Sequence, residues 1–314
     1  MFYVYILIII YCLLIHYVFS SRLNQTLACC NEKAEQTQSL SCFFKQNHPD
    51  QSQSNQQYLT STIVGGLGNQ LFIMFTTISY AIKYNLPFIF DYTPDLHYRK
   101  THWDGLYASL TCFSTKYNII WQTIFNSTTF PMSNYSEKAF YYTEIPPPSQ
   151  LKSNINRFTN GLKLNGYYQS YKYFHEYKRI IFRSMNIYNL QSQIYDRYFH
   201  PYFNTSKYVV AIHFRIGDYI RITKIYPIIP LQYYTNAIQH IITDLNIPNK
   251  SIRLLCVYDP NDNNRITNDY LEPLRIKFPG IEFTVVDSAM PDWHQMLLMS
   301  LCRVIIIPNS TFAW

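Results

Sequence analysis

Three polar side chains at the end of an apolar run have the chemistry needed to hold a phosphate. His213, Arg215 and Asp218 follow Tyr208–Ile212, whose length and β-branched content predict a buried strand. In an open α/β sheet, ligands bind where the strands end. A guanidinium group can donate two parallel charge-assisted hydrogen bonds to a phosphate and keeps its charge. The alternative is a structural ion pair between Arg215 and Asp218.

A second polar group, Asn309-Ser310-Thr311, follows the last apolar run of the chain. Its hydroxyls, together with the N–H groups of a following helical turn, could bind a phosphate. Residues of these types also cap helices, so the alternative is a cap on a helix that starts there.

A glycine-rich stretch lies between two predicted elements near residue 65. Gly65–Gln70 follows a short apolar strand at 63–64, precedes a predicted amphipathic helix at 71–84, and is followed by a predicted strand at 86–91. Glycines in such a loop let the backbone approach a ligand at the positive end of the helix. The alternative is an ordinary strand-to-helix turn.

The elements that must position these residues alternate regularly after residue 207. Apolar runs at 208–214, 252–259, 281–287 and 303–307 are separated by helical patterns. Strands joined by helices of this length indicate right-handed crossovers and a parallel sheet. We therefore predict an α/β protein whose second half is Rossmann-like.

Composition and segment boundaries suggest four parts. Residues 1–20 are almost wholly apolar and predict a membrane anchor, with a cleaved signal segment as the alternative. Residues 21–60 are rich in Gln, Ser and Asn and predict a flexible stem. We expect one Rossmann-like domain at 61–200 and another at 201–314.

The positive charge is concentrated in the middle of the chain. Residues 151–200 contain eight Lys and Arg against two acidic residues, while the formal net charge of the whole chain is +7. This segment is compatible with an anionic ligand or with membrane headgroups. We expect no nucleic-acid partner, because no reader motif or charged tail accompanies it.

Several segments together resemble the α-1,2-fucosyltransferases, an inverting, GDP-fucose-dependent glycosyltransferase family (the family 11 type). The resemblance covers most of the chain from residue 62 onward and departs from the family at Ile216, where a second basic residue is common. The segments that carry it are GGLGNQLF (65–72), NGYYQSYKYF (165–174), HFRIGDY (213–219), PLQYYTNAI (230–238), DWHQMLLMSLC (292–302) and IIIPNSTFAW (305–314).

The resemblance implies a GT-B-like fold, with two Rossmann-like halves facing a cleft and the second half shortened at its C-terminus. Arg215 would clamp the donor diphosphate, with His213 and Asp218 shaping that loop. Asn309, Ser310, Thr311 and Phe312 would belong to the nucleotide site, with Asp292 near the guanine and Asn69 at the reaction centre. For Asp292 the alternative is a capping box with Gln295.

The function implied is transfer of L-fucose from GDP-fucose to the 2-OH of a terminal galactose on a glycan. The alternatives are another GDP-sugar transferase, such as a protein O-fucosyltransferase, and an inactive sugar-binding relic. The catalytic base stays open among Asp91, Asp218 and the weaker candidate His102. Negative charge on the leaving group must be stabilised, and a divalent metal ion could do this. The sequence has no Asp-x-Asp motif that would bind such an ion, so we expect no cofactor and no metal. A single-pass Golgi location with a lumenal catalytic part is expected, or secretion after cleavage.

Overall fold

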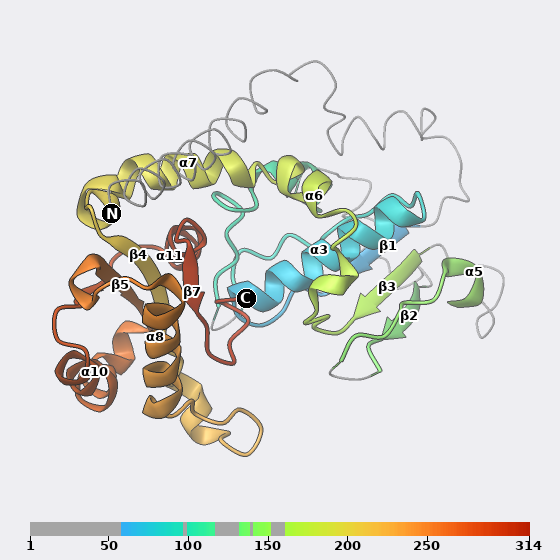
Figure 1. The fold of residues 1–314 in the computed structure, drawn as a ribbon. Helices are drawn as coiled ribbons and strands as arrows, with labels where there is room; N and C mark the ends of the chain where they lie inside the picture. The colour runs from blue at the N-terminus through green and yellow to red at the C-terminus, as the bar shows by residue number, and fades with distance from the viewer. Residues whose placement is uncertain (1–57, 97–98, 117–131, 139–140, 152–160) are drawn as a thin grey trace, which may run out of the picture. The chain divides into compact units, whose positions relative to one another are not determined.

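The computed structural model describes residues 58–96, 99–116, 132–138, 141–151 and 161–314. All of them belong to one compact unit, residues 50–314 (Figure 1). The predicted anchor at 1–20 and most of the predicted stem lie outside the described residues. In the described part of the chain, no helix combines the length and apolar character needed to cross a bilayer.

The first sheet is parallel, with strand order β1-β3-β2 (Figure 1). Its strands are β1 (Tyr58–Ser61), β2 (Met132–Ser136) and β3 (Gly161–Asn165). β1 therefore begins inside the segment that we expected to be stem and ends before the strand expected at 63–64. The segment expected as a strand at 86–91 forms isolated parallel bridges to Leu59 and Ser114 instead of a ladder.

Helix α3 (Leu67–Lys83) follows the glycine-rich stretch and is more enclosed than predicted. From Leu67 to Ile82 every residue except Asn69 is buried, so the amphipathic interpretation is wrong. The extra cover comes from the segment after β3, where Phe174 contacts the ring of Phe72 at 5.8 Å between centroids. A helix that is buried on nearly all sides in this way is a core helix.

Two helices connect the sheets and carry four of the eight basic residues of the segment 151–200. They are α6 (Lys178–Ser184) and α7 (Ile187–Tyr198), and the short α5 (Pro148–Leu151) precedes β3. Tyr198 Oη lies 2.9 Å from Nδ1 of His294, which attaches α7 to the helix before the last strand. The side chains of Lys178, Arg179, Arg183 and Arg197 are exposed, so the basic segment forms part of the surface.

The second sheet confirms the predicted alternation of strands and helices. Its strand order is β6-β5-β4-β7, and every neighbouring pair is parallel. The strands are β4 (Tyr208–His213), β5 (Ile252–Val257), β6 (Glu282–Val285) and β7 (Val304–Ile306). The helices are α8 (Leu231–Leu245), α9 (Asn263–Ile266), α10 (Glu272–Lys277) and α11 (Asp292–Ser300), with a π-helical turn at Thr267–Leu271 joining α9 to α10.

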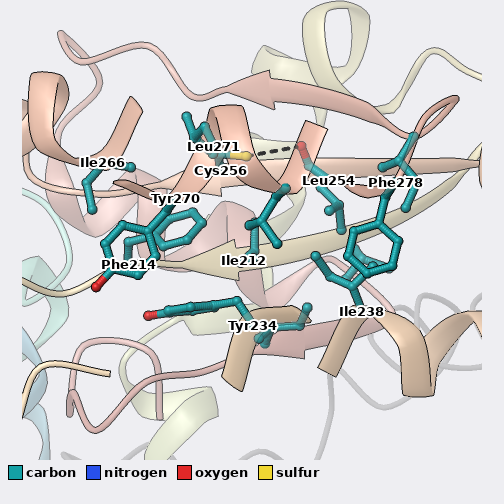
Figure 2. Close-up of a cluster of buried hydrophobic side chains, with 14 of the residues drawn as sticks. Ile212, Phe214, Tyr234, Ile238, Leu254, Cys256, Ile266, Tyr270, Leu271 and Phe278 are labelled. Atoms are coloured by element: carbon teal, nitrogen blue, oxygen red, sulfur yellow. Dashed lines mark hydrogen bonds between the residues drawn. The ribbon is translucent and has the colours of Figure 1, made fainter. Parts of the chain in front are cut away.

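The core of this half lies between the sheet and its helices. Figure 2 shows Ile212 of β4 and Leu254 of β5 among side chains from α8 and from the α9–α10 region. The rings of Phe214 and Tyr234 lie 4.6 Å apart, and burial of each such side chain stabilises the fold by about 1.5–3 kcal/mol. The α/β class with parallel sheets expected from the sequence is thus confirmed, while the domain boundary expected near residue 200 stays a prediction. The core holds the ends of β4 and β5 in place.

Candidate active site

A pocket of about 540 Å³ opens where β4 and β7 end. From β4 the chain proceeds outward to β5 and β6, and it then returns to place β7 on the other side of β4. Ligands of open α/β sheets bind at such a switch point, because the connections diverge there and leave a crevice. The pocket brings together nine of the predicted site residues: Asn69, His213, Arg215, Asp218, Asp292, Asn309, Ser310, Thr311 and Phe312.

The guanidinium group of Arg215 is held on two sides. Its Nη2 donates to Oδ1 of Asp218, and the group lies over the ring of Tyr219, 4.8 Å from the centroid. The Arg215 side chain is 19% exposed, whereas that of Asp218 is 55% exposed. The predicted ion pair and the predicted pocket position therefore occur together. A guanidinium has five N–H donors, so one carboxylate partner leaves others for an anion.

Two backbone features keep this loop in shape. Gly217 has φ +37°, a value that favours glycine, and its N–H donates to Oδ2 of Asp262 at 2.7 Å. The side chain of Ile216 is 2% exposed and packs in the core of the second half. Ile216, where the resemblance leads us to expect a second basic residue, is therefore not part of the pocket lining.

His213 is a neutral, buried member of the pocket wall. Its residue exposure is 5%, and its ring lies 5.1 Å from that of Phe312. Burial, and secondly the positive charge of Arg215, lower the pKa of His213 to about 3. His213 therefore cannot act as a cationic phosphate ligand near neutral pH.

The turn at 309–312 is fixed by hydrogen bonds from other segments. Asn309 Nδ2 donates to the carbonyl of Pro227 at 2.9 Å, and Tyr219 Oη donates to the carbonyl of Asn309 at 3.2 Å. The described residues 307–314 contain no helix, so the helix-cap interpretation is not realised there. Ser310 is buried, with 5% exposure, at the floor of this turn.

The glycine-rich stretch makes the closest backbone approach in the pocket. A Cβ atom on Gly68 would overlap the carbonyl oxygen of Thr311. Gly65 has φ +79°, and a Cβ atom there would lie 2.7 Å from Nδ2 of Asn69. The φ value of Gly65 favours glycine and a Cβ atom at Gly68 has no room, while a role of this stretch in binding a ligand stays a prediction. The N-terminal end of α3, with its positive partial charge, faces the pocket.

Asn69 joins three segments through one oxygen atom. Its Oδ1 accepts from Thr311 Oγ1 and from Gln169 Nε2, each at 2.8 Å. The neighbouring Gln70, which the sequence did not single out, is fully buried and donates to the carbonyls of Gly65 and Lys100, both at 3.0 Å. Gln70 therefore supports the glycine-rich stretch from behind.

Asp292 lines the pocket in contact with a histidine from the first half. His102 Nε2 lies 2.8 Å from Oδ1 of Asp292, and the same oxygen accepts from the N–H of Trp293. Burial would raise the pKa of Asp292, but the bond and charge of His102 and the Trp293 N–H outweigh it and lower that pKa. The capping box is not formed, because Gln295 Nε2 donates to the carbonyl of Met290 instead.

Asp91, a candidate base, lies outside the pocket lining. Its carboxylate accepts hydrogen bonds from Thr115 Oγ1 at 3.2 Å and from Thr93 Oγ1 at 3.4 Å. A base must reach the hydroxyl whose proton it removes, so this position does not support Asp91 in that role.

The sequence interpretation missed four lining residues of the first half. Arg99 Nη2 lies 3.8 Å from Oδ2 of Asp218, and Lys100 lies next to it in the pocket wall. Tyr167 and Gln169 lie just beyond the end of β3, in a stretch whose residue pattern predicts that the strand continues. Nothing in the spacing of Arg99 and Lys100 marks them, but Tyr167 and Gln169 lie inside the NGYYQSYKYF motif and could have been found there.

The segment 165–169 has a strained backbone. Tyr168 is fully buried with φ +50°, and Gly166 has φ +155° with no room for a Cβ atom beside Glu137. A bulky residue in this region costs on the order of 1–3 kcal/mol and persists where the surroundings impose it. Such strain is concentrated at functional sites, so the residues next to Tyr168 are candidates for a functional role.

The carboxylates and histidines of the described residues do not gather into a group of three or more that could hold a metal ion. The expectation of metal-independent chemistry is not tested by this observation and stays a prediction.

No protein-family model matches this chain, and no curated protein matches its sequence. Among solved structures, it is similar to a FUT1 mutant of Arabidopsis thaliana in complex with GDP, at 14% sequence identity and a TM-score of 0.44, over 93% of this chain and 75% of the other. It is also similar to the α-1,6-fucosyltransferase NodZ co-crystallised with GDP, at 13% identity and a TM-score of 0.43, over 82% and 90% of the two chains. NodZ comes from Bradyrhizobium.

A third solved structure, POFUT1 in complex with GDP, is similar at 11% identity and a TM-score of 0.45, over 83% of this chain and 93% of the other. All three TM-scores lie below 0.5. These likenesses therefore carry no argument about what this chain binds or transfers, and its function has to be inferred from the pocket itself.

Proposed function

We propose that the chain is an inverting fucosyltransferase that moves L-fucose from GDP-fucose to the 2-OH of a terminal galactose. One observation carries the proposal. Five segments that are far apart in the sequence, and on which the resemblance to α-1,2-fucosyltransferases rests, contribute residues to the same pocket. The lining includes residues from 65–69, 167–169, 213–219, 292–295 and 309–312.

The sixth segment of the resemblance supports the pocket from outside its lining. Tyr234 Oη on α8 donates to the carbonyl of His213 at 3.3 Å, at the end of β4. Tyr233 Oη donates to the carbonyl of Ile307, just after β7, at 2.5 Å. The two tyrosines thus hold the ends of the two strands between which the donor would bind.

The donor diphosphate would bind between two cations from opposite halves. Arg215 lies at the end of β4, and Arg99 comes from the first half, with Asp218 in contact with both. Because Ile216 is buried, Arg99, with Lys100 beside it in the pocket wall, would supply the further positive charge. Asp218 would then orient the two guanidinium groups and would not serve as a base.

The chemistry requires that charge on the leaving group be stabilised. The hydroxyl oxygen of the acceptor attacks the anomeric carbon, the bond from that carbon to the phosphate oxygen breaks, GDP leaves with the electron pair, and the hydroxyl proton is released to solvent. Negative charge therefore develops on the β-phosphate. Arg215 and the first N–H groups of α3 are fixed before the reaction, and such preorganised donors stabilise this charge effectively.

A nucleotide panel tests the donor assignment first. We expect GDP to raise the melting temperature of the protein and UDP to have little effect, and Arg215→Ala should abolish the shift. Arg265→Ala is the matched control, because Arg265 is a partly exposed arginine on α9 that pairs with Asp269 outside the pocket. Equal stabilisation by UDP, or an undiminished shift in Arg215→Ala, would contradict the donor assignment.

An acceptor panel then tests the linkage. GDP-fucose should be turned over on lactose or phenyl β-galactoside, and an α-1,2-specific fucosidase should release the fucose. Transfer to a folded protein instead would replace the galactoside assignment by a protein O-fucosyltransferase. GDP binding without transfer to either acceptor would indicate a non-catalytic sugar-binding protein.

Two further expectations remain proposals. The first is metal independence, which is refuted if a chelator removes activity and Mn²⁺ restores it. The second is a Golgi location through the apolar segment at residues 1–20, which tagged full-length and truncated chains would test by microscopy. Both concern features that the described residues leave untested.

A further inference from the structure

The wall of the pocket that faces the charged strand ends has a different chemistry. It is formed by the segment Asn165–Gln169, which we call the Tyr167 loop, and by Asn69 at the start of α3. Tyr167 and Gln169 both line the pocket, and neither carries a formal charge. The same pocket is also lined by Arg215 and Asp218.

The Tyr167 loop is held in its strained conformation by one carboxylate. Glu137 Oε2 accepts from the backbone N–H groups of Tyr167 and Tyr168, each at 2.9 Å. Glu137 N–H in turn donates to the carbonyl of Asn165 at 2.8 Å, which continues the pairing of β2 with β3. The buried ring of Tyr168 packs edge-on against Tyr173 at 5.3 Å. The loop is therefore fixed through its backbone and through Tyr168.

This arrangement leaves the side chain of Tyr167 available. Tyr167 is 38% exposed, although both its neighbours Gly166 and Tyr168 are tightly packed. Gln169 is connected to the opposite wall through Asn69, whose Oδ1 accepts from both Gln169 and Thr311. A ligand resting on Tyr167 would thus lie next to the donor side of the pocket.

An exposed aromatic ring beside carboxamide groups suits a neutral sugar. The apolar face of a hexose packs on an aromatic ring, and its hydroxyl groups hydrogen-bond with amide groups. A phosphate would find no cation on this wall segment, whereas the opposite wall offers Arg215. Arg99 and Lys100 also line the pocket, so its uncharged part is the stretch around Tyr167 and Gln169, where an uncharged part of a ligand would bind.

We propose that Tyr167 and Gln169 form the subsite for the acceptor, binding the terminal neutral hexose of the glycan against the Tyr167 ring. The inference rests on the proposed function, because it assigns the second substrate of that same pocket. Tyr167 would supply the stacking surface, and Gln169 would bind hydroxyl groups and keep Asn69 oriented toward both substrates.

Steady-state kinetics of Tyr167→Ala separate the acceptor from the donor. With lactose as acceptor, we expect KM for lactose to rise at least tenfold while KM for GDP-fucose stays within twofold. Tyr167→Phe keeps the ring and should retain most of the acceptor affinity. Tyr171→Ala is the matched control, because Tyr171 is a nearby tyrosine, 50% exposed, that does not line the pocket. The inference is overturned if KM for lactose is unchanged in Tyr167→Ala, or if both KM values rise together.

A direct binding measurement keeps this test independent of turnover. Saturation-transfer NMR with methyl β-galactoside should show the sugar ring protons in contact with the wild-type protein, and the signal should disappear in Tyr167→Ala. The GDP-induced melting shift should persist in the same variant, which shows that the donor side is intact. Absence of sugar binding to the wild type, or an equal signal in Tyr167→Ala, refutes the subsite. If GDP does not raise the melting temperature of the wild-type protein, the proposed function is refuted instead.

Discussion

The two walls of the pocket are built by different means. The wall of the second half is a set of strand ends, with His213 at the end of β4 and Ser310 after β7. The wall of the first half is a set of turns, with the glycine-rich stretch before α3 and the Tyr167 loop after β3. The strand-end wall carries Arg215 and Asp218. The first half contributes the cations Arg99 and Lys100, whereas its turn residues Tyr167 and Gln169 are uncharged.

This difference shows how one pocket can hold two unlike ligands. Strand ends at a switch point place side chains with little variation, which suits a charged group that needs fixed donors. A turn that contains a left-handed residue can leave the side chain of a neighbouring residue exposed. In the Tyr167 loop, Tyr168 is the left-handed residue and Tyr167 is the exposed neighbour. Substitutions that alter one wall at a time should therefore reveal whether the other is affected.

The largest effect is expected at Arg215. Arg215→Lys should lower kcat by about 10²–10³-fold, close to Arg215→Ala, because a point charge cannot replace two parallel N–H donors. Steady-state turnover of GDP-fucose on lactose measures it, with Arg265→Ala as the control. Near-wild-type turnover of the lysine variant would remove Arg215 from the donor wall.

Gly68→Ala should disturb the contact between the walls. Its Cβ atom would overlap the Thr311 carbonyl oxygen, and backbone atoms cannot move aside easily. We expect destabilisation of about 1–3 kcal/mol together with weaker GDP binding. Gly66→Ala is the matched control, because a Cβ atom there meets nothing within 4 Å. Equal urea midpoints for the two variants would show that the walls are not in contact at Gly68.

His213 should make the stability of the folded protein decrease at low pH. The unfolded chain protonates this histidine below a pKa of 6.5, whereas the folded chain does so only near pH 3, its lowered pKa being about 3. The unfolded state therefore binds more protons between these values, and His213 lowers stability as pH falls through that window. Between the two pKa values, protonation of this histidine in the unfolded state lowers the free energy of unfolding by about 1.4 kcal/mol for each unit that the pH falls.

Urea unfolding at pH 4, 5, 6 and 7 measures this contribution. The pH dependence of the free energy of unfolding should be shallower in His213→Gln than in the wild type. Parallel curves for the two proteins would mean that His213 is protonated in the folded state and is not buried as described.

Thr311→Val should have a smaller effect that reaches across the pocket. The variant keeps the side-chain shape but loses the hydrogen bond from Thr311 Oγ1 to Asn69 Oδ1. Such a bond contributes about 0.5–1.5 kcal/mol, so GDP affinity should fall by about two- to tenfold. Titration calorimetry with GDP measures it, and an unchanged affinity would mean that the two walls bind independently.

Asp91→Asn should have the smallest effect. Asp91 does not line the pocket, and asparagine keeps one oxygen that can accept from Thr115 Oγ1, while the Thr93 hydroxyl can turn to accept from the asparagine amide. We expect kcat within about twofold of the wild type, since surface substitutions away from such a site are usually small in effect. A large loss of kcat with unchanged GDP binding would restore Asp91 as a base.

The charged wall was largely predictable from the sequence. The apolar run at 208–212 and the polar residues after it are local signals, and parallel strands necessarily bring their ends to one edge. The contact between Arg215 and Asp218 is also local, because the two residues are three positions apart. These features require no knowledge of distant contacts.

The other wall depends on contacts that no local pattern shows. Arg99 reaches Asp218 across more than a hundred positions, and the φ value of Tyr168 is imposed by Glu137 and by burial. The enclosure of α3 likewise arises from Phe174, far along the chain, so its periodicity misled the interpretation. The strand ladder expected at 86–91 failed for the same reason: its partners contribute single bridges.

Titration calorimetry with GDP and GMP tests the central claim most directly, because the two ligands differ only in the β-phosphate that the charged wall is proposed to bind. We predict that the wild-type protein binds GDP at least tenfold more tightly than GMP, and that Arg215→Lys loses most of this difference. Equal affinities for GDP and GMP in the wild type, or an undiminished preference for GDP in Arg215→Lys, would contradict the account.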